Sequence, residues 1–299
     1  MTYHKPVLLD AAVDGLMIVP EGTYVDVTFG GGGHSALILS KLGQGKLVAF
    51  DQDKDAQDNV HADTRFTLVP DNFRNLAVRL EEMGAVPVDG ILADLGVSSH
   101  QFDVAERGFS IRFDAVLDMR MDQSQSLTAK DVINYYPEPE LTRIFREYGE
   151  LAASRRVAAE IVLQRGRQFI NTSGELRQVV MKFAPRTKEN TFYAQLFQAL
   201  RIEVNDELSA LRDLLQQSAK VLRKGGRLVV ISYHSLEDRL VKNYLNTGNF
   251  EGELHKDLFG HSTGLLFKSL TRKPVEPSPE EVEMNPRSRS AKMRIAERL

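Results

Sequence analysis

The chain has 299 residues, of which 42% are hydrophobic and 26% charged, and its formal net charge is −3. This size and composition predict a globular protein with one large domain or two smaller ones. The chain contains no cysteine, which excludes disulfides, thiolate metal sites, iron–sulfur clusters and a cysteine nucleophile.

Strand and helix patterns alternate along the first third of the chain. Short apolar runs predict strands over residues 23–29, 45–53, 65–73 and 88–99. Between them, residues 34–43, 54–63 and 74–84 have helical patterns. This βαβαβαβ order predicts a parallel sheet with helices on both of its faces.

The strand patterns stop at about residue 106. Residues 108–122 have no clean period and predict an ordered loop, and helical patterns follow over residues 128–136, 138–149, 151–166 and 174–184. The α/β pattern then resumes with a long helix over residues 197–222 and strands over residues 227–235, 266–274 and 291–299. We therefore expect an α/β domain built from residues 1–105 and 200–299, with a helical domain inserted over residues 106–199.

The apolar segments are too short to cross a membrane, because none approaches the roughly 20 residues that a membrane helix needs. Near the N-terminus, Asp10 and Asp14 interrupt the apolar stretch, so a signal peptide is not expected. These features predict a cytoplasmic protein that has no membrane partner.

Four consecutive glycines, Gly30–Gly33, follow the first predicted strand. Gly31, Gly33 and Ala36 match the G-x-G-x-x-A form of the dinucleotide fingerprint, which is a weak signal by itself. A P-loop is disfavoured, because no Gly-Lys-Ser/Thr sequence follows the run. The run predicts a ligand-binding loop and leaves the ligand open.

Three acids at strand ends favour one ligand. Asp26 precedes the glycines, Asp51 ends the second predicted strand and Asp94 ends the fourth. Carboxylates here would repel a pyrophosphate, whereas Asp51 can accept hydrogen bonds from ribose hydroxyls. The set therefore favours S-adenosylmethionine, which carries an ammonium and a sulfonium group. Ordinary roles remain open for each acid: a turn cap for Asp26, a solvated loop acid for Asp51 and a helix N-cap for Asp94.

Two segments are basic in this mildly acidic chain. Residues 155–188 contain eight Lys or Arg and two Asp or Glu, and residues 285–299 contain five and one. Each segment alone is typical of a solvated helix face, but the two together favour a polyanionic partner.

Seven motifs together resemble one family of methyltransferases. They lie between Thr28 and Arg298 and read TFGGGGHS, DLGVSS, AERGFS, LDMRMD, FQALRIEVNDEL, ISYHSLEDR and NPRSRSAKMRIAER. They resemble the RsmH (MraW) family, bacterial enzymes that methylate the N4 amino group of a cytidine near the ribosomal P site, nucleotide 1402 of 16S rRNA. The resemblance implies a Rossmann-like class I methyltransferase domain with a mostly parallel seven-stranded sheet and an inserted helical domain for substrate recognition.

The resemblance also implies which residues contact S-adenosylmethionine, namely Gly32, Gly33, His34, Asp51, Phe73, Asp94 and Gln101. The two glycines allow close approach of the backbone. Phe73 suits packing on adenine, and its alternative role is that of an ordinary core aromatic. His34 opens a helix and is expected to act through its backbone.

The chemistry needs an acceptor for a hydrogen of the cytosine amine, whose lone pair is delocalised into the ring, and it needs in-line positioning. Asp94 is the first catalytic candidate and His234 the second. Ser232, His234 and Ser235 are candidates to hold the base, although Ser235 and Glu237 also match a helix cap. The absence of cysteine excludes the covalent thiolate route to cytosine carbon 5.

The expected partner is 16S rRNA in the small ribosomal subunit, and the target base must leave its stack to react. Candidates to hold the RNA backbone are Arg155, Arg156, Arg165, Arg167, Arg287 and Arg289. The oligomeric state is open, with a homodimer as one alternative.

The sequence departs from the family in two places. Ala194, Gln195 and Leu196 replace a common Thr-Arg-Thr run, which puts an RNA contact of that arginine in doubt, and Ala115-Val116 replaces a common Gly-Pro.

Two other functions stay open. Asp26 argues against a nicotinamide oxidoreductase, and the intact acids and glycines argue against a ribosome-binding protein without catalysis.

Overall fold

A computed structural model describes residues 6–60, 62–257, 260 and 262–299. The chain divides into two compact units. The sheet unit consists of Met1–Gly96 and Leu208–Leu299, and the helical unit consists of Val97–Glu207. The sequence predicted the inserted helical domain over residues 106–199, which is shorter at both ends than the helical unit of the structure.

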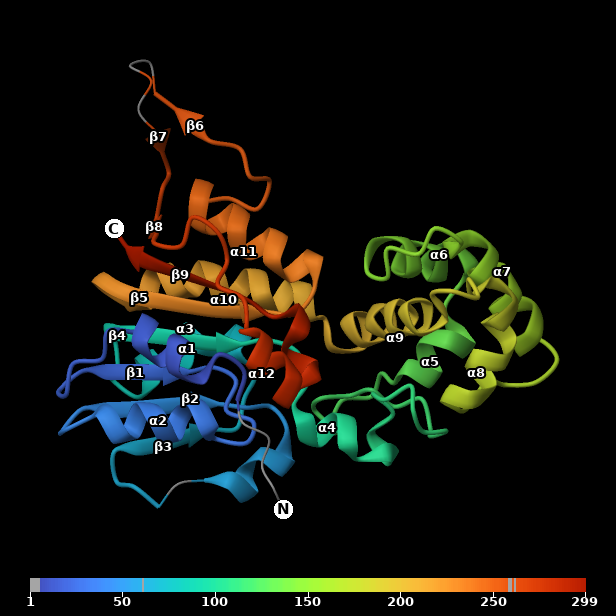
Figure 1. Cartoon of the computed structure of the whole chain (residues 1–299), viewed down its shortest axis with the longest axis horizontal. Helices are drawn as coiled ribbons and strands as arrows, with labels where there is room; N and C mark the ends of the chain where they lie inside the picture. Colours follow the sequence, from blue (N-terminus) through green and yellow to red (C-terminus); the bar gives the residue numbers. More distant parts are fainter. Residues whose placement is uncertain (1–5, 61, 258–259, 261) are drawn as a thin grey trace. The chain divides into compact units, whose positions relative to one another are not determined.

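Seven strands form the sheet in the order β3-β2-β1-β4-β5-β9-β8 (Figure 1). Their bounds are β1 Thr23–Asp26, β2 Lys46–Phe50, β3 Phe66–Val69, β4 Val88–Asp94, β5 Leu222–Ser232, β8 Phe267–Ser269 and β9 Lys292–Arg298. Strands β1 to β5 pair in parallel, whereas β9 is antiparallel to both β5 and β8. Six strands lie within predicted runs, whereas β5 begins at Leu222, five residues before the run predicted over residues 227–235. The mostly parallel seven-stranded sheet confirms the predicted fold class.

Helices cover both faces of the sheet (Figure 1). Helices α1 and α2 pack on one face, and α3, α10 and α11 pack on the other. Ile91 and Leu92 are neighbours in β4 and belong to the two different core clusters, because successive side chains of a strand point to opposite faces. The bounds are α1 Leu9–Gly15, α2 Gly33–Lys41, α3 Leu76–Glu82, α10 Glu207–Val221 and α11 Ser235–Thr247.

Smaller elements complete the sheet unit. An antiparallel pair of short strands, β6 (His255–Lys256) and β7 (Ser262–Thr263), was not predicted, and α12 (Pro279–Met284) precedes the 3₁₀ helix η5 (Pro286–Ser290). A further 3₁₀ helix, η2 (Phe73–Asn75), leads into α3.

The helical unit has its own core, which includes Ile144, Ile161 and Leu200. Its helices are α4 Ser99–Asp103, α5 Ala129–Tyr135, α6 Glu138–Glu147, α7 Ser154–Arg165, α8 Ser173–Val180 and α9 Glu189–Asn205, with the 3₁₀ helices η3 Ala105–Arg107 and η4 Met181–Phe183. Helices α5 to α8 confirm the four predicted helical segments. Within the described ranges, no helix is both long and apolar enough to span a bilayer.

Two predicted helices are wrong in part. Residues 54–63 form only a 3₁₀ helix, η1 (Lys54–Asn59), and position 61 lies outside the described residues. The side chains of Asp51 and Asp53 accept hydrogen bonds from the backbone N–H groups two residues further on, and such turns compete with an α-helix. The single helix predicted over residues 197–222 is divided between α9 and α10 by Asp206, whose φ of 48° is left-handed and ends α9.

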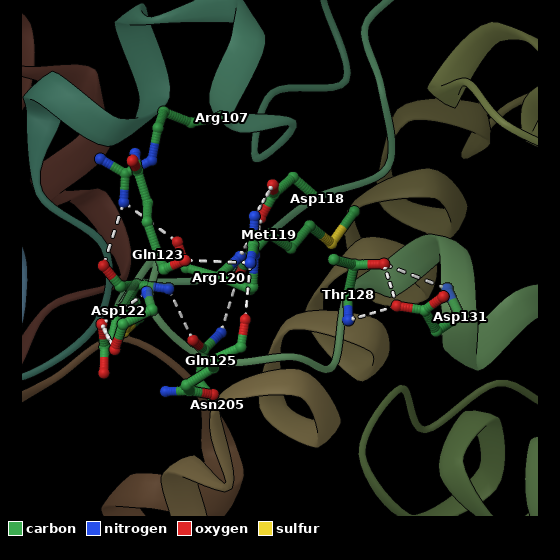
Figure 2. A network of polar contacts seen from close by, with 12 residues as sticks. Arg107, Asp118, Met119, Arg120, Asp122, Gln123, Gln125, Thr128, Asp131 and Asn205 are labelled. Carbon is green, nitrogen blue, oxygen red and sulfur yellow. Dashed lines mark hydrogen bonds and ion pairs between the residues drawn. The ribbon is translucent and has the colours of Figure 1, made fainter.

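The ordered loop predicted over residues 108–122 lies in the helical unit, and side chains hold it (Figure 2). The Arg120 guanidinium donates twice to the Asp118 carboxylate, at 2.8 Å each, and also to two backbone carbonyls, at 3.0 and 2.6 Å. Buried Asn205, the last residue of α9, accepts from the Met121 backbone N–H and donates to the Met119 carbonyl. These bonds hold the loop in one conformation although it contains no regular element between η3 and α5.

Candidate functional site

The candidate site lies at the carboxyl edge of the parallel strands in the sheet unit. The glycine run follows β1, Asp51 follows β2, Phe73 follows β3 and Asp94 is the last residue of β4. Because parallel strands end at the same edge, the fold brings these residues together, and this edge is where open α/β sheets bind ligands.

The glycine run forms a tight turn into α2. Gly30 and Gly32 have φ values of 50° and 75°, a region that favours glycine, and Gly32 is the N-cap residue of α2. A Cβ atom on Gly33 would lie 2.2 Å from Cγ of Pro6. Side chains at these positions would therefore distort the turn.

Asp51 holds this turn from the next strand. Its Oδ2 accepts a hydrogen bond from the Gly30 backbone N–H, and its Oδ1 accepts one from the Asp53 N–H, both at 2.8 Å. Burial raises the pKa of Asp51 to about 6, against the lowering effect of these two donors. Each oxygen has a second lone pair, so the carboxylate can still accept bonds from ligand hydroxyls.

Asp26 is only 1% exposed and bonds to residues on either side of the glycine run. Its Oδ2 accepts from the Ser35 hydroxyl at 2.7 Å, and its Oδ1 accepts from the Thr28 backbone N–H at 3.2 Å. Burial raises the pKa of Asp26, and His34 opposes that rise. Asp26 therefore ties β1 to α2, a role close to the turn-capping alternative.

Ser35→Ala is expected to lower the free energy of unfolding by about 1–3 kcal/mol, because it leaves one oxygen of a buried carboxylate without its hydroxyl donor. Urea unfolding at pH 7 measures the change. Ser40→Ala is the matched control, since Ser40 lies on the same helix but is exposed, and its effect should stay within about 0.5 kcal/mol. Equal effects of the two substitutions would contradict this role of Ser35.

Asp94 is held from several sides, and its side chain is 22% exposed. Its Oδ1 accepts a hydrogen bond from the Tyr233 hydroxyl at 2.7 Å, and its Oδ2 lies 3.8 Å from Nδ1 of His34. The Asp94 backbone N–H donates to the Thr28 hydroxyl oxygen at 2.7 Å. Burial raises the pKa of Asp94 to about 6, although His34 and Tyr233 both favour its ionised form. A carboxylate with such a pKa can exchange a proton near neutral pH.

The His34 ring is buried and contacts the protein on both sides. Its Nε2 lies 3.2 Å from the Val7 carbonyl, and its Nδ1 faces Asp94. The sequence alone suggested only a backbone role for this histidine, and the structure adds the side-chain contact with Asp94.

His234 is the N-cap of α11, with Nδ1 accepting from the Glu237 backbone N–H at 3.4 Å. Its Nε2 lies 3.2 Å from Oε1 of Glu237. The sequence predicted a cap by Ser235 with Glu237, but the cap residue is His234, which pairs with Glu237, and Ser235 is the exposed first residue of the helix. The catalytic role of His234 stays a prediction.

Three further candidates, Phe73, Ser232 and Gln101, lie on different elements. Phe73 is partly buried against the sheet-unit core, and buried Ser232 donates to the Lys292 carbonyl at 3.3 Å. Gln101 belongs to the helical unit, where its side chain accepts from the Ser98 N–H in a capping box. Each residue has a structural contact, and their ligand contacts stay predictions.

The candidate arginines divide between the units. Arg155, Arg156 and Arg165 lie on α7, with the first two exposed. The Arg156 guanidinium lies over the Phe183 ring, 5.8 Å from its centroid. Exposed Arg167 follows α7, and Arg287 and Arg289 lie on η5 of the sheet unit.

Two contributors to the site were missed by the sequence analysis. Ser35 fixes Asp26, and Tyr233 fixes Asp94. Tyr233 lies inside the motif ISYHSLEDR, but nothing in the motif indicates that its hydroxyl contacts a residue 139 positions away.

The sequence matches the MraW methylase family over residues 1–299. It is 56% identical over 298 residues to the ribosomal RNA small subunit methyltransferase H of Cytophaga hutchinsonii, and the match covers 99% of each chain. It is 54% identical over 299 residues to the protein of the same name from Parabacteroides distasonis, with 99% of this chain and 98% of the relative covered.

Proposed function

We propose that this chain, which belongs to the MraW methylase family, transfers a methyl group from S-adenosylmethionine to N4 of a cytidine in 16S rRNA. The target is nucleotide 1402, near the P site of the small ribosomal subunit. The observation that carries the proposal is the carboxyl edge of the sheet unit, where a glycine turn, Asp51 and Asp94 meet. Two relatives named as ribosomal RNA small subunit methyltransferases support the choice of RNA as substrate.

S-adenosylmethionine supplies an electrophilic methyl group on a sulfonium. Among the proposed contacts, Gly32 and Gly33 allow the backbone to approach it, and Asp51 accepts bonds from its ribose hydroxyls. The remaining proposed contacts are His34, Phe73, Asp94 and Gln101. The buried carboxylates of Asp51 and Asp94 fit this cofactor, because they suit a cationic ligand with hydroxyls better than a pyrophosphate.

Asp94 is the proposed acceptor of the amine hydrogen. The cytosine amine is neutral and poorly nucleophilic, so a carboxylate beside it stabilises the charge that develops as nitrogen attacks the methyl group. The pKa of Asp94, about 6, makes the carboxylate a stronger base than an exposed aspartate and leaves it mostly ionised at neutral pH. Ser232, Ser235 and His234 are proposed to hold the base beside it.

The proposed function is tested with small subunits that lack the modification. The purified chain and labelled S-adenosylmethionine should place label in RNA that yields N4-methylcytidine on nucleoside analysis, and subunits already methylated should accept none. Tight binding of S-adenosylhomocysteine without N4-methylcytidine would overturn the proposal and favour a ribosome-binding protein without catalysis.

The exposed arginines of α7 are proposed to contact RNA phosphates. Arg155→Ala is expected to raise the KM for small subunits several-fold and to lower the slope of log affinity against log salt by about 1, as for one lost phosphate contact. Affinity for S-adenosylhomocysteine should not change. Arg146→Ala is the matched control, because exposed Arg146 lies on α6 and pairs with Glu147. An unchanged salt slope in Arg155→Ala would remove Arg155 from the interface.

Other parts of the RNA surface are also proposals. The helical unit is proposed to recognise the substrate, and Arg156, Arg165, Arg167, Arg287 and Arg289 are proposed to contact the RNA backbone. On α9, Leu196 is buried in the core of the helical unit and Gln195 is half-buried.

We propose a cytoplasmic location, where ribosomal RNA is found, and a homodimer as an alternative to a monomer.

A further inference from the structure

Tyr233 connects the end of β5 to the proposed catalytic carboxylate. It follows Ser232, the last residue of β5, and its backbone N–H donates to Oε2 of Glu237 at 2.8 Å. Its ring packs against the core that α1 and α2 share with the sheet. Its hydroxyl is therefore fixed from both ends of the residue, and it donates to Oδ1 of Asp94 at 2.7 Å.

We propose that Tyr233 is a positioning residue for methyl transfer, whose hydroxyl holds the Asp94 carboxylate in one orientation and favours its ionised form. This inference rests on the proposed function. With Oδ1 occupied by Tyr233, the carboxylate cannot rotate without breaking a short hydrogen bond. Oδ2, which lies 3.8 Å from Nδ1 of His34, is the oxygen left for the amine hydrogen.

The groups around Asp94 act in opposite directions. Burial raises its pKa most, and the negative charges of Asp26 on β1 and Glu237 on α11 raise it further. His34 on α2 and the Tyr233 hydroxyl lower it. Loss of the hydroxyl should therefore move the pKa of Asp94 upward from about 6 and leave less carboxylate at neutral pH.

Tyr233 itself stays protonated where the enzyme would work. Burial raises its pKa well above 10, and the charges of Asp94, Glu237 and Glu281 add to the rise. The phenol is thus a hydrogen-bond donor over the whole range in which Asp94 titrates.

The test is Tyr233→Phe with two readouts. In the free protein, the ¹³Cγ signal of Asp94, assigned through Asp94→Asn, should titrate near pH 6, and the substitution should raise the midpoint by roughly one pH unit. In methyl transfer, kcat should fall roughly ten-fold at pH 7. About two-fold of this loss comes from protonation of Asp94 and should disappear as pH rises, and the rest comes from the lost orientation of the carboxylate. KM and the affinity for S-adenosylhomocysteine should change less than about two-fold, because the variant keeps the ring packing and the backbone hydrogen bond to Glu237.

Tyr24→Phe is the matched control, because Tyr24 is also buried but its hydroxyl accepts from the Val19 N–H and does not bond to Asp94. It should lower stability without moving the Asp94 midpoint. An unchanged midpoint in Tyr233→Phe would overturn the inference. If that variant does not fold, the wild-type sequence is labelled with 3-fluorotyrosine instead. A more acidic phenol donates more strongly, so the midpoint of the Asp94 titration should fall. A constant midpoint would overturn the inference. The carboxyl titration needs no substrate, so it is independent of a failure of wild type to methylate small subunits.

Discussion

Asp94→Asn is expected to slow methyl transfer to small subunits by roughly 100- to 10,000-fold, the range typical of a lost general base. Asparagine keeps the shape of the side chain and can accept the Tyr233 hydrogen bond, but it carries no charge and cannot take the amine hydrogen. Single-turnover kinetics with saturating S-adenosylmethionine measure the chemical step directly. A single-turnover rate constant within about three-fold of wild type would show that Asp94 is not the acceptor.

The control for this substitution lies on the same strand. Asp89 is near the opposite end of β4, where it accepts from the Thr23 N–H and from the Arg223 side chain. Asp89→Asn removes the same charge from the same strand and should leave kcat unchanged. Affinity for S-adenosylhomocysteine separates the two roles left open for Asp94, since a large loss in Asp94→Asn would indicate a contact with the cofactor's ammonium group.

Asp51→Ala is expected to weaken binding of S-adenosylhomocysteine by roughly 10- to 100-fold, the loss of about 1.5–3 kcal/mol that accompanies removal of a charged hydrogen-bond acceptor. Isothermal titration calorimetry measures the dissociation constant. The substitution also removes the acceptor of the Gly30 and Asp53 backbone N–H groups, so part of the loss could come from a distorted glycine turn.

A ligand lacking the hydroxyls separates these two causes. If Asp51 accepts from the ribose, 2′,3′-dideoxy-S-adenosylhomocysteine should bind wild type weakly, and Asp51→Ala should weaken it little further. Additive losses in this cycle would mean that Asp51 acts only through the turn. Unchanged affinity for S-adenosylhomocysteine itself would remove Asp51 from the site.

Local patterns were sufficient to predict the framework of the site. The alternation of apolar runs and helices placed the strands, and the rule that parallel strands share a carboxyl edge then brought Asp51 and Asp94 together with the glycine turn. The predictions failed where a polar side chain competes with the local pattern. Asp206 looked like one more residue of a long helix, yet it takes a left-handed conformation and divides that helix.

The sequence by itself determined the order of the elements, the acids at the strand ends and the family, because period, spacing and motif are properties of neighbouring residues. Only the tertiary structure decided what each acid does. Asp26 is buried and accepts from Thr28 and Ser35, on either side of the glycine run. Asp94 has one oxygen held by Tyr233, 139 residues away, and the other faces His34. Burial sets the pKa of these carboxyls, and burial depends on packing between distant segments, which no local pattern contains.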